Sequence, residues 1–121
     1  MGTIFVTGFP GFLGSALVKR LLKRYPAEVT ITCLIQGKFY EVAVARAQRI
    51  AAEIGLGAER IVLVEGDITW PDLGLSPDFY VRLKGDIVEI YHLAAVYDLG
   101  VGRDLAMRVN VDGTKHVLAM A

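Results

Sequence analysis

The sequence is poor in cysteine, with a single one, Cys33, among its 121 residues. One thiol cannot form an internal disulfide framework and is too few for a cysteine-based zinc site. Cys33 lies in an apolar run, where a thiol behaves as a small hydrophobic side chain. We therefore predict a buried structural cysteine and no metal site.

An excess of charge of either sign is also missing, because 13 basic and 13 acidic residues cancel. Without a basic excess, nothing in the composition attracts nucleic acid or an anionic membrane. No apolar run approaches the roughly 18 residues of a membrane span. The first residues, MGTIFVTGFPG, lack the basic and apolar regions of a signal peptide. Hydrophobic residues make up 54% and charged residues 21%, which excludes disorder, so we expect one folded, soluble, cytoplasmic domain.

Short runs rich in β-branched residues alternate with longer stretches of helical periodicity. Strands are predicted at residues 3–7, 29–35, 61–65 and 87–93, and helices at 12–24, 42–54, 78–84 and from 104 onward. This alternation is typical of a parallel sheet with helices on both faces. The first helix has an apolar stripe opposite its basic residues, formed by Leu13, Leu17, Val18, Leu21 and Leu22. Gly55 and Gly57 are expected to close the second helix, and Gly85 the third.

The segment between the first strand and the first helix is the most informative, and it reads Thr-Gly-x-x-Gly-x-x-Gly. Gly8 permits a tight turn, Gly11 lets the backbone approach a pyrophosphate, and Gly14 lets the helix pack closely on the strand. The phosphates then bind free N–H groups at the helix N-terminus, where Phe12 and Leu13 lie. This context predicts dinucleotide binding by a Rossmann-type, doubly wound α/β fold with strand order 3-2-1-4. A purely structural turn is the alternative.

The residues after the second predicted strand bear on the choice of cofactor. NAD-specific sites usually place Asp or Glu about 20 residues beyond the glycines, to bind the ribose 2′-hydroxyl. Here the chain reads Leu34-Ile35-Gln36-Gly37-Lys38, without an acid. Gln36 can bind a ribose without repelling a phosphate, Lys38 can pair with a 2′-phosphate, and Arg46 is a weaker candidate. The pattern favours NADP, with NAD as the alternative and a solvated surface role still open for Lys38.

Three further motifs follow: Gly66-Asp67-Ile68-Thr69, Tyr91-His92-Leu93-Ala94-Ala95 and Val109-Asn110-Val111-Asp112-Gly113-Thr114. With the glycine loop they resemble the successive signatures of the extended short-chain dehydrogenase/reductases. The stretches GDITWPDLGLSPDFYVRL, IVEIYHLAAVYDL and VNVDGT are most similar to the thioester-reductase and fatty-acyl-CoA-reductase branch. The resemblance covers essentially the whole chain, but only the N-terminal half of that family's NAD(P)-binding domain. It implies an oxidoreductase that binds a nicotinamide dinucleotide.

The resemblance also implies roles for single residues. Asp67 resembles the family acid that accepts a hydrogen bond from the adenine amino group, with Ile68 packing beside the ring. A strand-end turn residue is the alternative for Asp67. Ala94 and Ala95 match small residues that pass close to the cofactor ribose, and Tyr97 is expected to border the nicotinamide pocket.

The catalytic part of the resemblance is incomplete. Asn110 matches an asparagine that kinks the fourth helix and helps hold a proton-relay water, which is a supporting role; a core asparagine is the alternative. The family's chemistry also needs a Tyr-x-x-x-Lys pair and a Ser or Thr beyond that helix. Tyr80 and Lys84 have this spacing but precede the fourth strand, so we interpret them as a coincidence. His92 is interpreted as a hydrogen-bonded core residue and His116 as a surface residue.

No stop signal follows the last predicted helix, so residues 1–121 are expected to be the N-terminal part of a longer NAD(P)-binding domain. The fourth strand is almost continuously apolar, which is typical of a central strand, and its open edge would favour self-association. The predicted function is the dinucleotide-binding portion of an NAD(P)H-dependent reductase of an acyl thioester or aldehyde. A nucleotide-sugar epimerase or dehydratase, a steroid- or flavonol-type reductase of the same superfamily, and a non-catalytic dinucleotide-binding module remain alternatives.

Overall fold

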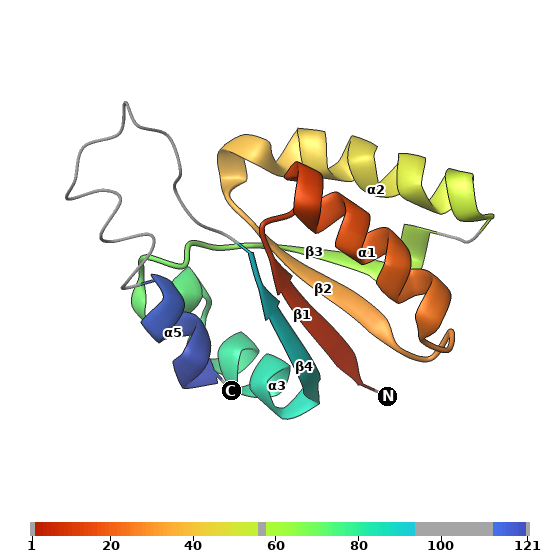
Figure 1. Ribbon diagram of the computed structural model, residues 1–121. Coiled ribbons are helices and arrows are strands. Elements are labelled where there is room, and N and C mark those ends of the chain that lie inside the picture. Colours follow the sequence, from red (N-terminus) through yellow and green to blue (C-terminus); the bar gives the residue numbers. More distant parts are fainter. Residues whose placement is uncertain (1, 56–57, 94–112, 121) are drawn as a thin grey trace.

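A four-stranded parallel sheet forms the centre of the protein (Figure 1). The computed structural model describes residues 2–55, 58–93 and 113–120. The strands are β1 (Thr3–Thr7), β2 (Thr30–Ile35), β3 (Ile61–Glu65) and β4 (Ile87–His92). They are arranged in the order β3-β2-β1-β4, and every neighbouring pair is parallel. The predicted fold class and strand order are therefore confirmed.

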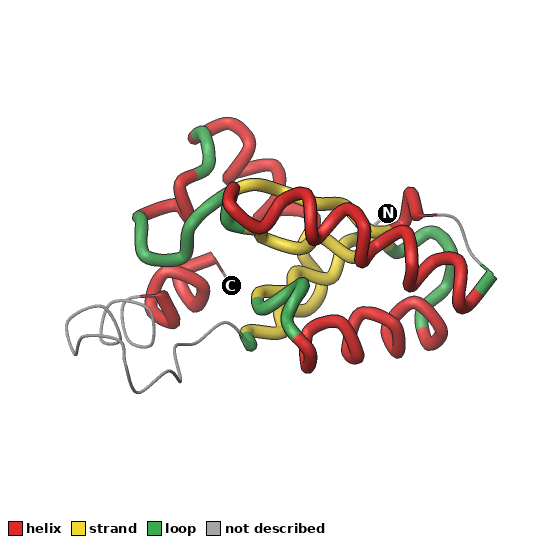
Figure 2. The backbone as a smooth tube through the Cα atoms, turned by 90° about the horizontal axis from the view of Figure 1, so that it is seen from above, coloured by secondary structure: helices red, strands yellow, loops and turns green. Residues whose placement is uncertain are grey.

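Helices cover both faces of the sheet, as Figure 1 and the view from above in Figure 2 show. The helices α1 (Phe12–Arg24) and α2 (Tyr40–Ile54) lie on one face, and α3 (Pro77–Asp86) and α5 (Gly113–Met120) on the other. In the described part of the chain, none of these helices has the length and apolar character needed to cross a bilayer.

The core has two halves, divided by the sheet. All five residues of β1 are buried, and their side chains alternate between the two faces. Ile4 and Val6 pack with α1 and α2, whereas Phe5 packs with α3 and α5. Cys33 is fully buried on the α1–α2 side, and this burial raises the pKa of its thiol to about 12. The predicted structural cysteine is confirmed.

Some element boundaries differ from the sequence prediction. The helix α3 begins earlier, because Pro77 occupies its first position and the Ser76 hydroxyl accepts a hydrogen bond from the Phe79 N–H at 3.3 Å. It also continues through Gly85, which was expected to end it. By contrast Gly55 does end α2, in the left-handed conformation with φ 73°. Of the helix expected from residue 104 onward, residues 104–112 lie outside the described part.

A buried arginine that the sequence analysis overlooked holds the end of α1. Arg60 is 8% exposed, and its guanidinium donates to the carbonyls of Leu22, Tyr25, Pro26 and Val29 at 2.8–3.3 Å. Carbonyls at a helix C-terminus carry partial negative charge and lack helical partners. Arg60 therefore satisfies these groups and ties the α1–β2 connection to the start of β3.

The edge strand β4 departs from the expectation of a strand buried on both faces. It pairs with β1 alone among the described residues, and its register shifts between Thr3 and Ile4. Val88 lies at this irregularity and is 60% exposed. The apolar pattern of β4 thus correctly predicts a strand, but within the described residues one edge of it stays open.

Candidate functional site

The glycine loop connects β1 to α1 at the carboxyl edge of the sheet. Gly8 has φ 97°, and its carbonyl accepts a hydrogen bond from the Gly11 N–H at 2.9 Å, which closes the turn. The first helical hydrogen bond of α1 runs from the Ser15 N–H to the Gly11 carbonyl. The N–H groups of residues 12–14 therefore have no acceptor in the helix, and no side chain caps them. Such N–H groups fit the phosphates of a dinucleotide.

The backbone of this loop leaves no room for a side chain at Gly11 or Gly14, whether or not a ligand is bound. A Cβ at Gly11 would lie 2.7 Å from the Gly8 carbonyl oxygen, and a Cβ at Gly14 would strike the same carbonyl and approach the Phe9 nitrogen. The role predicted for Gly14, close packing of the helix on the strand, is thus corrected: the close contact is with the loop backbone. The absence of a side chain at Gly11 avoids a clash with the Gly8 carbonyl and also leaves room for a ligand.

Phe12 and Leu13 lie at the start of α1 and are the exposed large apolar side chains of this helix, 87% and 68% respectively. The predicted apolar stripe is therefore wrong at Leu13, which is exposed in the first turn of α1. Both residues remain available to a bound ligand.

Arg46 on α2 braces the outer side of the loop. Its Nη1 donates to the Ser15 hydroxyl at 3.0 Å and to the Pro10 carbonyl at 3.4 Å, and the same hydroxyl donates to the Pro10 carbonyl. The sequence analysis considered Arg46 as a partner for a 2′-phosphate. In the structure one of its nitrogens supports the glycine loop.

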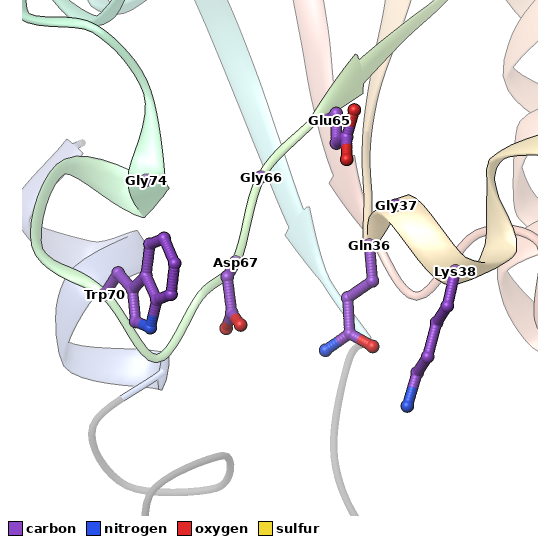
Figure 3. A pocket seen from close by; sticks show the side chains of 8 residues that line it. All are labelled: Gln36, Gly37, Lys38, Glu65, Gly66, Asp67, Trp70 and Gly74. Carbon is purple, nitrogen blue, oxygen red and sulfur yellow. The ribbon is translucent and has the colours of Figure 1, made fainter.

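A cavity of about 580 Å³ opens where β2 and β3 end (Figure 3). It is lined by Gln36, Gly37, Lys38, Glu65, Gly66, Asp67, Trp70 and Gly74. Side chains of three predicted cofactor-binding residues, Gln36, Lys38 and Asp67, project toward the same side in Figure 3. The structure therefore brings together residues that lie about 30 positions apart in the sequence.

Asp67 organises the turn that follows β3. Its Oδ1 accepts hydrogen bonds from the Thr69 N–H at 2.9 Å and the Thr69 hydroxyl at 2.6 Å, and its own N–H donates to the Leu73 carbonyl. Within the described residues its Oδ2 has no such partner, so one carboxylate oxygen remains for a ligand. Ile68 is buried in the core beside α5 and does not line the cavity.

An acid that the sequence analysis missed also lines this cavity. Glu65 is the last residue of β3 and pairs in register with Ile35, the last residue of β2. Its carboxylate occupies the position that a Cβ on Gly37 would take. An acid is thus present near the end of β2 after all, but the neighbouring strand supplies it. Figure 3 shows it set back from the tips of Gln36 and Lys38.

The two histidines connect α5 to the rest of the site. His92 is half-buried and hydrogen-bonded to Thr7 at 2.6 Å and to Thr114 at 3.0 Å, and its burial lowers its pKa. The predicted hydrogen bonding of His92 is therefore confirmed, although its side chain is only partly buried. His116, expected on the surface, instead donates from Nδ1 to the Ile68 carbonyl at 2.6 Å and so holds the turn next to Asp67.

Ala94, Ala95, Tyr97 and Asn110 lie outside the described residues. The Tyr80–Lys84 pair is on α3, where Tyr80 packs against the core and Lys84 donates to the Ala119 carbonyl. No group of side chains suited to a metal ion occurs in the ranges that the structure describes.

Residues 6–121 match the male sterility protein family, an NAD-binding family. The chain belongs to this family. Fatty acyl-CoA reductase 1 of Arabidopsis thaliana is 30% identical over 136 residues, covering 98% of this chain and 28% of the relative. The terminal R domain of the myxalamid PKS-NRPS pathway has a TM-score of 0.81 at 35% identity, and covers all of this chain.

A second solved structure, the reductase (R) domain of a non-ribosomal peptide synthetase from Mycobacterium tuberculosis, has a TM-score of 0.74 at 26% identity. This chain spans 30% of that domain and 31% of the myxalamid domain. Membership of the male sterility protein family confirms the resemblance to the reductase branch. It also establishes a nicotinamide dinucleotide as the cofactor class.

The packing around the glycines generates a prediction about stability. Gly14→Ala should lower the free energy of unfolding by about 1–3 kcal/mol, because the loop must move away from the Gly8 carbonyl. Gly85→Ala is the matched control: apart from its own helix, nothing lies within 4 Å of the added methyl group, so the helix should gain about 0.5–1 kcal/mol. Urea unfolding measures both. Equal stability of the two variants would contradict the close contact at Gly14.

Proposed function

We propose that this chain is the dinucleotide-binding portion of an NAD(P)H-dependent reductase that acts on an acyl thioester. The observation that carries the proposal is the glycine loop, with its unpaired N–H groups at the start of α1, in a chain of the male sterility protein family. The substrate class is inferred from relatives, which are named as a fatty acyl-CoA reductase and as R domains of peptide synthetases. An aldehyde carbonyl is the other candidate substrate.

We propose that the diphosphate and the adenosine part of the cofactor bind along the carboxyl edge of the sheet. The N–H groups of residues 12–14 bind the diphosphate, and Oδ2 of Asp67 accepts from the adenine amino group. Gln36 and Lys38 lie beside the adenosine ribose. When bound, the reduced nicotinamide supplies the hydride.

The residues proposed for the nicotinamide end of the site lie outside the described ranges. We propose that Ala94 and Ala95 pass along the ribose and that Tyr97 borders the nicotinamide. Asn110 is proposed to support a proton-relay water. In this proposal the Tyr-x-x-x-Lys pair belongs to the remainder of a longer domain, for which residues 1–121 supply the N-terminal part.

The reaction can be tested on the protein at its natural length. Incubation with NADPH and a long-chain acyl-CoA should consume NADPH, measured as lost absorbance at 340 nm, and should release the aldehyde or alcohol. A sample without the thioester is the control. The proposal is wrong if neither NADPH nor NADH binds in a fluorescence titration, since the glycine loop would then have no cofactor to hold.

We further propose that the cofactor is NADP rather than NAD. Gln36 and Lys38 offer an uncharged and a cationic group at the ribose, whereas the carboxylate of Glu65 lies behind Gly37. Lys38 is therefore the group that we propose pairs with a 2′-phosphate.

This choice predicts that NADPH binds more tightly than NADH and that Gln36→Asp inverts the preference, by about tenfold or more, because a carboxylate repels the 2′-phosphate. Gln48→Asp makes the same change at an exposed position of α2 and is the matched control. Fluorescence titration with both cofactors gives the ratio. A wild-type preference for NADH would refute the assignment.

The open edge of β4 leads to a proposal about assembly. Unpaired backbone groups on a strand edge are a template for pairing with another strand. We propose that a further strand, from a longer chain or a second copy, covers this edge. A polypeptide limited to residues 1–121 should therefore self-associate in sedimentation experiments at micromolar concentration. A stable, strictly monomeric species would contradict this.

A further inference from the structure

Trp70 is the one tryptophan of the sequence, and its side chain is 61% exposed. It nevertheless lines the cavity, beside Asp67 and across from Gln36 (Figure 3). The roles assigned above to the cavity do not use it. A large aromatic ring held at the wall of a ligand cavity is a candidate for contact with the ligand.

Backbone hydrogen bonds fix the turn that carries Trp70, and the indole ring itself lies against Gly74. The Trp70 N–H donates to the Asp67 carbonyl at 3.1 Å, and the Trp70 carbonyl accepts from the Leu73 N–H at 3.0 Å. The indole packs against Gly74, where an added Cβ would lie 3.1 Å from its Cε3 atom. The ring is therefore part of the same turn that positions the Asp67 carboxylate.

This turn contains an unfavourable backbone conformation. Asp72, Leu73 and Gly74 have φ angles of 54°, 59° and 71°, so three successive residues are left-handed, two of them with side chains. Such residues persist only where their surroundings enforce them, and they are frequent at ligand sites. Leu73 is fully buried in the core, and the packing of its side chain there stabilises the left-handed backbone of the turn. Trp70, whose carbonyl accepts a hydrogen bond from the Leu73 N–H, is the exposed aromatic residue of the same turn.

We propose that Trp70 forms an aromatic wall on which the adenine ring of the cofactor stacks. Asp67 accepts from the amino group at the edge of the adenine, and the indole supplies an apolar surface for its face. Stacking of a base on an aromatic side chain is a common source of affinity and needs no further polar group. This inference rests on the proposed function, because it requires a dinucleotide in the cavity.

The experiment uses AMP, ribose 5-phosphate and NADPH as probes. AMP should quench the fluorescence of Trp70, whereas ribose 5-phosphate, which lacks the base, should leave it unchanged. In calorimetric titrations Trp70→Ala should weaken AMP and NADPH about tenfold. Trp70→Phe, which keeps an aromatic face, should retain most of the affinity and guards against a loss caused by misfolding of the turn.

Two controls separate stacking from a general loss of structure. Reduced nicotinamide mononucleotide lacks adenine, so Trp70→Ala should leave its affinity unchanged. Val81→Ala truncates another exposed apolar residue, on α3 outside the cavity, and should leave AMP binding unchanged. If AMP and NADPH bind the wild type but Trp70→Ala binds them equally well, the stacking inference fails and the dinucleotide proposal stands. If the wild type binds neither, both fail.

Discussion

The carbonyl group of Gly8 is the point on which the carboxyl edge of the sheet depends. It accepts the hydrogen bond that closes the glycine loop, and it occupies the space that side chains at Gly11 and Gly14 would need. Because the loop folds tightly around this carbonyl, α1 begins directly at the end of β1. The unpaired N–H groups of its first turn are thereby presented at the sheet edge, where parallel α/β proteins bind their ligands.

The helix that presents these groups is fixed at both ends. At its start, Arg46 reaches from α2 to Ser15 and the Pro10 carbonyl and supports the loop from outside. At its end, the buried guanidinium of Arg60 donates hydrogen bonds to carbonyls that the helix leaves unpaired. Between them the apolar face of α1 packs on β1 and β2. The direction of the helix, and with it the direction of its unpaired N–H groups, is set by one contact on the outer side of the glycine loop and one at the far end of the helix.

The part of the site proposed for adenine is built in a different way. The turn after β3 has a buried anchor, Leu73, and an Asp67 carboxylate that bonds its own backbone. His116 then joins α5 to this turn through the Ile68 carbonyl. Since α5 also contacts His92 through Thr114, one helix connects the turn after β3 to the end of β4. The site therefore depends on the order of strands in the sheet as well as on the local loops.

The sequence by itself determined the alternation of strands and helices and the glycine loop, because both follow from local periodicity and spacing. The strand order followed from the Rossmann-type fold that these features indicate, and the family from the resemblance of the four motifs. Gln36, Lys38 and Asp67 follow within three residues of predicted strands, and in the structure all three line the same cavity. The cofactor roles of these three residues stay predictions, as do those of Ala94, Ala95, Tyr97 and Asn110.

Tertiary structure alone decided the rest. Glu65 lies against Gly37 because the register of two strands places the ends of β2 and β3 side by side, and no spacing within the sequence reveals that register. The contacts of Arg60 and His116 could not be predicted from the sequence either, because their partners are backbone carbonyls, which every residue has. Trp70 appears in the sequence as an ordinary loop residue. Its place on the cavity wall follows from the buried Leu73 and the left-handed turn, which only the packed core enforces.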